Sequence, residues 1–117
     1  MHVVALSASE RPSRCPWQVG EVRGVERSAL RARLGHPAHV ETDTSSTFGG
    51  EEDWWGYRNA AGTVVGICLR VPYEHVVVYF SEVSQAAVDD VRALLTPWTV
   101  EVFDSPYVDG PRPPGSR

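Results

Sequence analysis

The sequence predicts an α+β domain in which an antiparallel sheet of four to five strands is covered by two short helices, giving two layers. Three observations support this fold class. Apolar residues recur at helical spacing in two segments, they alternate with other residues in several more, and turn-forming residues separate the alternating segments. An antiparallel sheet with one apolar face needs a cover, and the two amphipathic helices supply it.

Length and composition fit one such domain. The 117 residues suffice for a single hydrophobic core, and 42% hydrophobic with 22% charged residues is typical of a soluble globular chain. We predict one domain over residues 1–108, with an irregular lead-in at 1–20 that contains a short strand at His2–Leu6. The tail at 109–117 is rich in proline and glycine and lacks an apolar anchor, so we expect it to be disordered.

Both helices are predicted with their end signals. The first covers Val25–Leu34, where apolar residues recur at three- and four-residue spacing. Gly35 can adopt the left-handed conformation that ends a helix, and Pro37 cannot continue one. Ser84 is a favourable N-cap for the second helix, and Pro97 ends it.

The strands follow from alternation and from turn chemistry. Four segments alternate or are rich in β-branched and aromatic residues: Asp53–Tyr57, Thr63–Val71, His75–Phe80 and Trp98–Phe103. On the first of them, Trp55 and Tyr57 share one face and Trp54 takes the other. Turn residues at Arg58–Gly62 and Pro72–Glu74 make the first three strands consecutive antiparallel neighbours.

Charge and hydropathy exclude several classes of function. The chain has 15 acidic and 11 basic residues, a net charge of −4, which argues against a nucleic-acid partner. No apolar segment approaches the roughly 18 residues that span a bilayer, so we expect no membrane association. The start lacks the apolar run of a secretory signal, which favours the cytoplasm; a periplasmic location would need an upstream leader. Cys15 and Cys68 leave a single disulfide open.

Motifs for catalysis are missing. The chain has no phosphate-binding loop, nucleophile elbow, zinc-protease helix or pair of cysteines two residues apart, so we expect neither an enzyme nor a cofactor. The nearest metal pattern is His36 and His39 followed by Glu41, but Pro37 lies between the histidines and no fourth ligand is evident. We expect no metal site. The adjacent acids at 51–53 lack the pocket that a catalytic carboxylate pair requires.

One segment has an unusual charge pattern. Between Arg33 and Arg58 there are five acidic side chains and neither arginine nor lysine, and aromatic residues lie among the acids. Carboxylates steer a basic partner, and aromatic side chains are common anchors in interfaces. We therefore predict a partner-binding surface made of Glu41, Asp43, Phe48, Glu51, Glu52, Asp53 and Trp54. The alternative is a solvated acidic loop, with Trp54 packed under the second helix.

Part of the chain resembles a known family. The segment Gly24–Pro37 resembles the helix, glycine and proline signature of the outer-membrane assembly lipoproteins of the BamE/SmpA type and of the β-lactamase-inhibitor-protein-like fold, and Trp55-Gly56-Tyr57 matches the aromatic strand that follows. The resemblance implies a helix pair on an antiparallel sheet whose exposed surface binds another protein without a cofactor or catalysis. The sequence departs from the lipoprotein branch in its leader and lipobox cysteine, so we do not expect an envelope anchor.

In type, the chain also resembles bacterial immunity proteins, which are small acidic domains that neutralise one cognate toxin. We therefore expect a non-enzymatic inhibitor whose partner is a basic toxin domain. Two alternatives stay open. The first is a small-molecule binder or minor enzyme with a pocket between sheet and helices that uses Tyr73, His75 and Tyr79. The second is an envelope assembly factor of the BamE/SmpA type.

Overall fold

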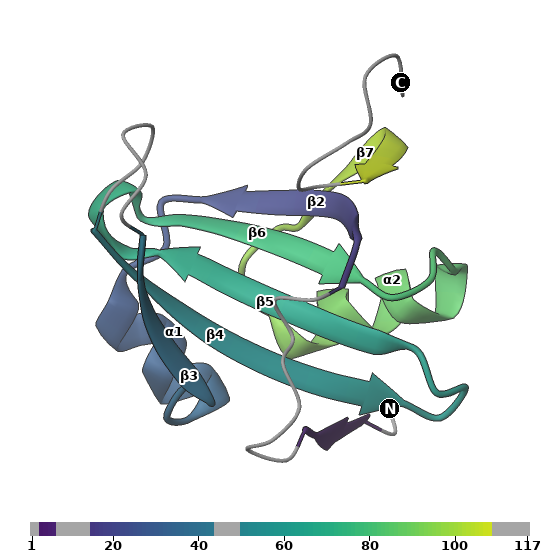
Figure 1. Cartoon of the computed structure of the whole chain (residues 1–117), viewed down its shortest axis with the longest axis horizontal. Helices are drawn as coiled ribbons and strands as arrows, with labels where there is room; N and C mark the ends of the chain where they lie inside the picture. The colour runs from purple at the N-terminus through teal and green to yellow at the C-terminus, as the bar shows by residue number, and fades with distance from the viewer. Residues whose placement is uncertain (1–2, 7–14, 44–49, 109–117) are drawn as a thin grey trace.

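A seven-stranded antiparallel sheet with two helices forms the protein in the computed structural model, which describes residues 3–6, 15–43 and 50–108 (Figure 1). The elements in chain order are β1 (Val3–Ala5), β2 (Trp17–Arg23), α1 (Arg27–Leu34), β3 (His39–Asp43), β4 (Gly50–Asn59), β5 (Val64–Arg70), the 3-10 turn η2 (Val71–Tyr73), β6 (His75–Phe80), α2 (Gln85–Leu94) and β7 (Glu101–Val108). The α+β class and the two helices are confirmed, but the sheet has more strands than the predicted four to five. Neither described helix is long and apolar enough to cross a lipid bilayer.

The strand order is β1-β4-β5-β6-β2-β7, and β3 also pairs with β4. Strands β1 and β3 therefore share the outer edge of β4, with β1 opposite residues 57–59 and β3 opposite residues 50–54. The β4–β5–β6 meander and the strand at the N-terminus agree with the prediction. Strand β7 starts later than the predicted Trp98, and β2 begins at Trp17, inside the range expected to be irregular.

The two strands that the prediction missed have weak patterns for physical reasons. In β2 the pairing shifts between Gln18 and Gly20, and Val19 and Val22 both join the core, so the apolar spacing is three instead of two. In β3 the residues are mostly polar because it is a short edge strand, and its Val40 is exposed.

Apolar residues fill both faces of the sheet. On one face, Trp55, Ile67 and Val78 lie side by side on β4, β5 and β6 and pack with the helices, including Leu30 of α1 and Val91 of α2. The opposite face carries a second cluster, formed by Cys15, Trp54, Cys68, Val77 and Tyr79. The predicted division of Trp55 and Trp54 between two faces is therefore confirmed.

Local signals set the end of α1 and the start of α2 as predicted. The Gly35 backbone has φ +88° and donates its N–H to the Arg31 carbonyl at 2.8 Å, closing α1. The Ser84 hydroxyl accepts a hydrogen bond from the Ala87 N–H at 3.2 Å at the start of α2. The first helix begins at Arg27, two residues after the predicted Val25. The expected tail at 109–117 lies outside the described residues.

Candidate functional site

Asp53, at the centre of the predicted acidic surface, lies inside the fold. It follows the alternation of Trp55 and so points to the helix-covered face of β4, where its side chain is 0% exposed. Two arginines one turn apart on α1 bind it. Arg27 donates from its Nε and Nη2 at 2.9 and 2.7 Å. Arg31 donates to the same carboxylate from its own Nε and Nη2 at 2.9 and 3.0 Å. Asp53 therefore fastens α1 to the sheet and is not available as an exposed acid.

The electrostatics of this cluster keep the carboxyl ionised. Burial, the largest influence, raises the pKa of Asp53, but the hydrogen bonds and charges of Arg27 and Arg31 together outweigh it and hold the pKa below its ordinary value. The hydrogen bond to Asp53 in turn raises the pKa of the Arg27 guanidinium. The cluster is a partly buried, charge-assisted network of four hydrogen bonds on one fully buried carboxylate.

Glu51 and Glu52 point to opposite faces of β4. The Glu51 side chain is 52% exposed, and its oxygens lie 3.4 Å from the guanidinium nitrogens of Arg27. The Glu52 side chain is mostly covered, and its Oε2 lies 3.8 Å from Arg70 Nε. Both separations exceed the about 2.7–2.9 Å of a strong charge-assisted hydrogen bond. Of these two acids, Glu51 is the more accessible to a partner.

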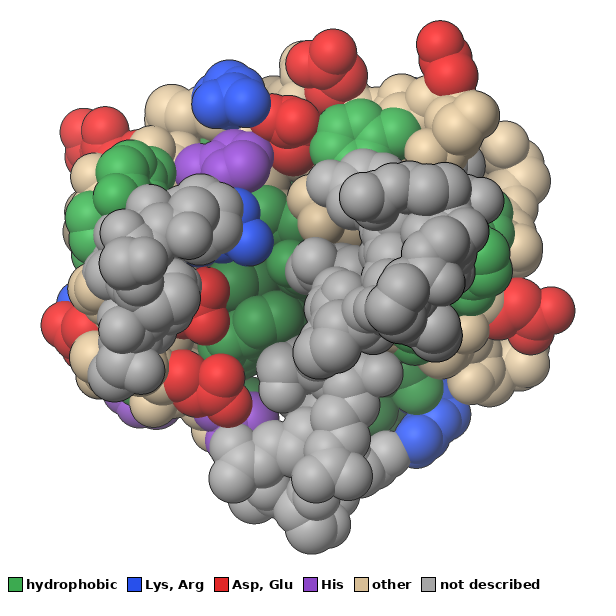
Figure 2. Space-filling view, turned by 45° about the horizontal axis from the view of Figure 1, so that its top comes forward, with side chains coloured by type: hydrophobic (Ala, Val, Ile, Leu, Met, Phe, Trp, Pro, Cys, Tyr) green, Lys and Arg blue, Asp and Glu red, His purple; other side chains and the backbone are tan. Residues whose placement is uncertain are grey.

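A row of ionisable residues crosses the face of the sheet away from the helices. At one level of the register, five strands carry, in order, Glu41, Glu52, Arg70, His75 and Arg23. The two glutamates stand directly opposite each other, where like charges repel. Figure 2 shows acidic, basic and histidine side chains beside a hollow floored by hydrophobic side chains.

His75 is the titratable centre of this row. Its Nε2 lies 3.2 Å from Glu21 Oε1, and Arg23 binds the same oxygen at 2.8 Å. Burial lowers the pKa of His75, and although the hydrogen bond and charge of Glu21 act to raise it, the net shift is downward, helped by the positive charges of Arg23 and Arg70. At neutral pH the imidazole is therefore mainly uncharged.

Trp54 is buried in the second cluster, 6% exposed, on the face opposite α2. Its ring centroid lies 5.5 Å from that of Tyr79, with 34° between the planes, and its Nε1 donates to Glu52 Oε1 at 3.3 Å. The alternative in which Trp54 packs under the second helix is therefore wrong. Of the remaining predicted residues, Phe48 and the Asp43 side chain lie outside the described part of the chain.

The turn between β5 and β6 adds two residues that the prediction did not include in the surface. Tyr73 is 53% exposed at the end of η2, and Glu74 follows in the left-handed conformation, with φ +50°. The Pro72 ring occupies the space that a Cβ on Gly50 would need, so the turn packs directly on the first residue of β4. Because β4 and β5 are antiparallel, the end of β5 lies beside the start of β4. We call this region the acidic end; it comprises Glu41, Glu51, Glu52, Tyr73 and Glu74.

The two cysteines belong to the second cluster. Both are free and buried, and burial raises the pKa of Cys15 to about 11 and that of Cys68 even further above its ordinary value. Thiols with raised pKa values are poor nucleophiles at neutral pH. Within the described ranges, no group of three or more metal-ligating side chains comes together, and His36 is exposed.

Comparisons with protein-family models, with curated proteins and with solved structures found no match for this chain. The resemblances to immunity proteins and to the BamE/SmpA lipoproteins therefore stay predictions.

Proposed function

We propose that the chain is a non-enzymatic protein-binding domain of the immunity or inhibitor type, which neutralises a more basic toxin domain through its acidic end. One observation supports this function above all. The half-exposed Glu51 and Tyr73 lie on neighbouring parts of the sheet end, which the packing of Pro72 on Gly50 holds together. A preorganised surface of this kind binds without first ordering its own turns.

Each component of the acidic end has a separate role in binding. The carboxylates of Glu51 and Glu74 attract a basic partner over distances of about 10 Å at moderate salt, which raises the association rate. Tyr73 supplies a ring that is 53% exposed and that a partner would cover, and tyrosine is among the residues that contribute most to interface energies. Asp53 and Trp54 contribute indirectly, by fixing β4 in place.

The long contact between Arg27 and Glu51 also favours a basic partner. The two side chains are 3.4 Å apart, which is longer than a short charge-assisted hydrogen bond between an arginine and a carboxylate. An arginine of the partner could bind the carboxylate of the half-exposed Glu51 without displacing Arg27 from Asp53, because Arg27 holds Asp53 through shorter hydrogen bonds. The same contact would be screened by salt.

Charge reversal with a matched control tests the proposal. The double variant Glu51→Lys/Glu74→Lys changes the acidic end, whereas Glu82→Lys/Asp89→Lys makes the same change in net charge at exposed positions near α2. The partner is first captured from the native source at low salt, identified, and purified for binding to the intact chain. We expect the first double variant to associate at least about tenfold more slowly at low salt, and the control to change the rate far less.

Two results would contradict the proposal. One is equal slowing by both double variants, which would mean that only net charge matters. The other is a stoichiometric partner that binds the Glu51→Lys/Glu74→Lys variant as fast as it binds the unmodified chain. Tyr73→Ala supplies an independent check, because it should raise the dissociation rate while the association rate changes little.

A further inference from the structure

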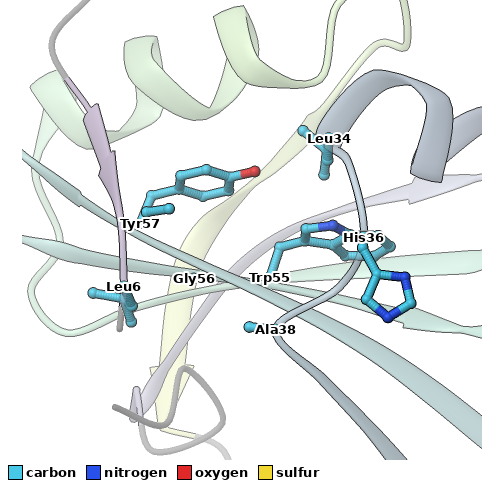
Figure 3. Close-up of a pocket in the computed structure, with 8 residues that line it drawn as sticks. Leu6, Leu34, His36, Ala38, Trp55, Gly56 and Tyr57 are labelled. Carbon is cyan, nitrogen blue, oxygen red and sulfur yellow. The ribbon is translucent and has the colours of Figure 1, made fainter. Parts of the chain in front are cut away.

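A cavity of about 240 Å³ opens at the outer edge of the sheet, far along β4 from the acidic end. It is bordered by the end of β1 and the residue after it, by the end of α1 and the segment that follows, and by β4; the lining includes Leu6, Leu34, His36, Ala38, Trp55 and Tyr57 (Figure 3). The lining does not include the three residues that the sequence predicted for a pocket between sheet and helices, which are Tyr73, His75 and Tyr79.

The pairing of the strands creates this opening. The Ala38 N–H donates to the Trp54 carbonyl at 2.8 Å, and the Leu6 N–H donates to the Gly56 carbonyl at 2.9 Å. Two different segments therefore meet the edge of β4 on either side of Trp55. Both carbonyls at the borders of the gap are therefore paired.

Two aromatic rings form the walls of the cavity. Trp55 and Tyr57 are two residues apart on one face of β4, which places their attachment points about 7 Å apart. The Trp55 indole is held in place because its Nε1 donates to the Gly35 carbonyl at 3.0 Å. Figure 3 shows the Tyr57 and Trp55 rings extending from the same strand, with Leu6 and Leu34 at other sides of the space between them.

The polar groups at the cavity suit a ligand that accepts hydrogen bonds. Burial raises the pKa of the Tyr57 hydroxyl, even though the positive charge of Arg33 acts to lower it, so the hydroxyl is protonated and can donate at neutral pH. His36 is exposed at the border and offers an imidazole. None of the described residues that line the cavity has a carboxylate, so an anionic group would meet no like charge among them.

The size of the cavity limits the ligand. It is larger than the roughly 150 Å³ of an apolar cavity known to hold benzene, and smaller than the about 300–1,000 Å³ of sites for drug-sized molecules. We propose that this cavity is a binding site for a planar aromatic molecule of one or two fused rings that bears a carboxylate. The ring lies against Trp55 and Tyr57, and the carboxylate faces the Tyr57 hydroxyl. This site is independent of the proposed protein-binding function.

Titration of the intact chain with indole-3-carboxylate, followed by ligand-observed NMR and calorimetry, tests the site. We expect a dissociation constant on the order of 0.1–1 mM, as befits so small a ligand. Ala38→Leu places a larger side chain at the cavity and should weaken binding at least about tenfold. Ala29→Leu makes the same change at an exposed position of α1 and should leave the affinity within about twofold.

A second variant separates the role of the hydroxyl from that of the cavity. Tyr57→Phe keeps the ring, so it should weaken indole-3-carboxylate several-fold while leaving indole itself nearly unchanged. Thermal melts confirm that each variant is folded. The proposal is overturned if neither probe binds at millimolar concentration, or if folded Ala38→Leu binds indole-3-carboxylate as well as folded Ala29→Leu does. If Tyr57→Phe weakens indole and indole-3-carboxylate equally, the Tyr57 hydroxyl does not bind the carboxylate, and that part of the proposal is wrong.

Discussion

Arg27 holds the carboxylate of Asp53 by two hydrogen bonds of 2.7 and 2.9 Å, across 26 residues of sequence. Arg31 binds the same carboxylate from the next turn of α1. The helix is short and buries only Leu30 fully, so its apolar contact alone is small. The ionic network therefore fixes the orientation of α1 on the sheet, and the start of β4 with it.

Removing Asp53 should destabilise the fold more than removing either arginine. We expect Asp53→Ala to lower the free energy of unfolding by about 3–5 kcal/mol, the range found when a buried charge pair loses one partner. Arg27→Ala and Arg31→Ala should each cost less, because the other arginine still neutralises the carboxylate. Urea denaturation of the three variants measures this. A smaller cost for Asp53→Ala than for both arginine variants would contradict the network.

The same carboxylate gives stability a dependence on acid. Because the folded-state pKa of Asp53 lies below its unfolded value of about 3.9, its contribution is complete above that value. As the pH falls, the unfolded chain takes up the proton first, and the contribution is lost as the pH passes through the folded pKa. Asp53→Asn should flatten this part of the stability curve, measured by urea denaturation between about pH 5 and pH 2. An unchanged curve would mean that other carboxyls determine the acid dependence.

His75 should affect stability at a higher pH. Its folded-state pKa is lowered from about 6.5, so below that pH the unfolded chain binds a proton that the folded chain does not. Stability therefore falls as the pH drops from about 6.5 to the folded pKa of His75. His75→Gln should remove this decrease. A His75→Gln curve that runs parallel to that of the unmodified chain over this window would show that the Glu21 contact balances the burial.

Both tryptophans of β4 should be important for stability, even though they face opposite sides of the sheet. Trp55 is 3% exposed and Trp54 is 6% exposed, so truncation of either to alanine should cost about 3–5 kcal/mol. If Trp54 faced outward into solvent, its truncation to alanine would lower the free energy of unfolding much less. A loss below about 1 kcal/mol for Trp54→Ala, measured by chemical denaturation, would show that the second cluster contributes little.

Local signals explain why much of the fold could be predicted. Gly35 and Ser84 end and start the helices through hydrogen bonds to residues three or four positions away, so a short stretch of sequence contains the whole signal. The alternation of Val65, Ile67 and Leu69 is equally local. Strand β2 was not predicted because its shift in register at Val19 removes the alternation of apolar and polar residues that indicates a strand.

The surroundings of the acids depend on distant residues, so the candidate site was harder to predict. One signal was present in the sequence, because Asp53 shares its face of β4 with Trp55 and so had to point to the helices. Two arginines four residues apart on α1 were the available partners. The approach of Tyr73 to β4 follows only from the packing of Pro72 on Gly50, which no local pattern indicates.

The decisive measurement is the association rate of the purified partner as a function of salt, for the unmodified chain and for Glu51→Lys/Glu74→Lys. If the acidic end is the binding surface, the rate falls steeply with salt for the unmodified chain, and the variant has a slower rate with a flatter salt dependence. If the partner binds elsewhere, the unmodified chain and the variant would associate at the same rates and with the same dependence on salt. That result would contradict the assignment of the acidic end as the binding surface.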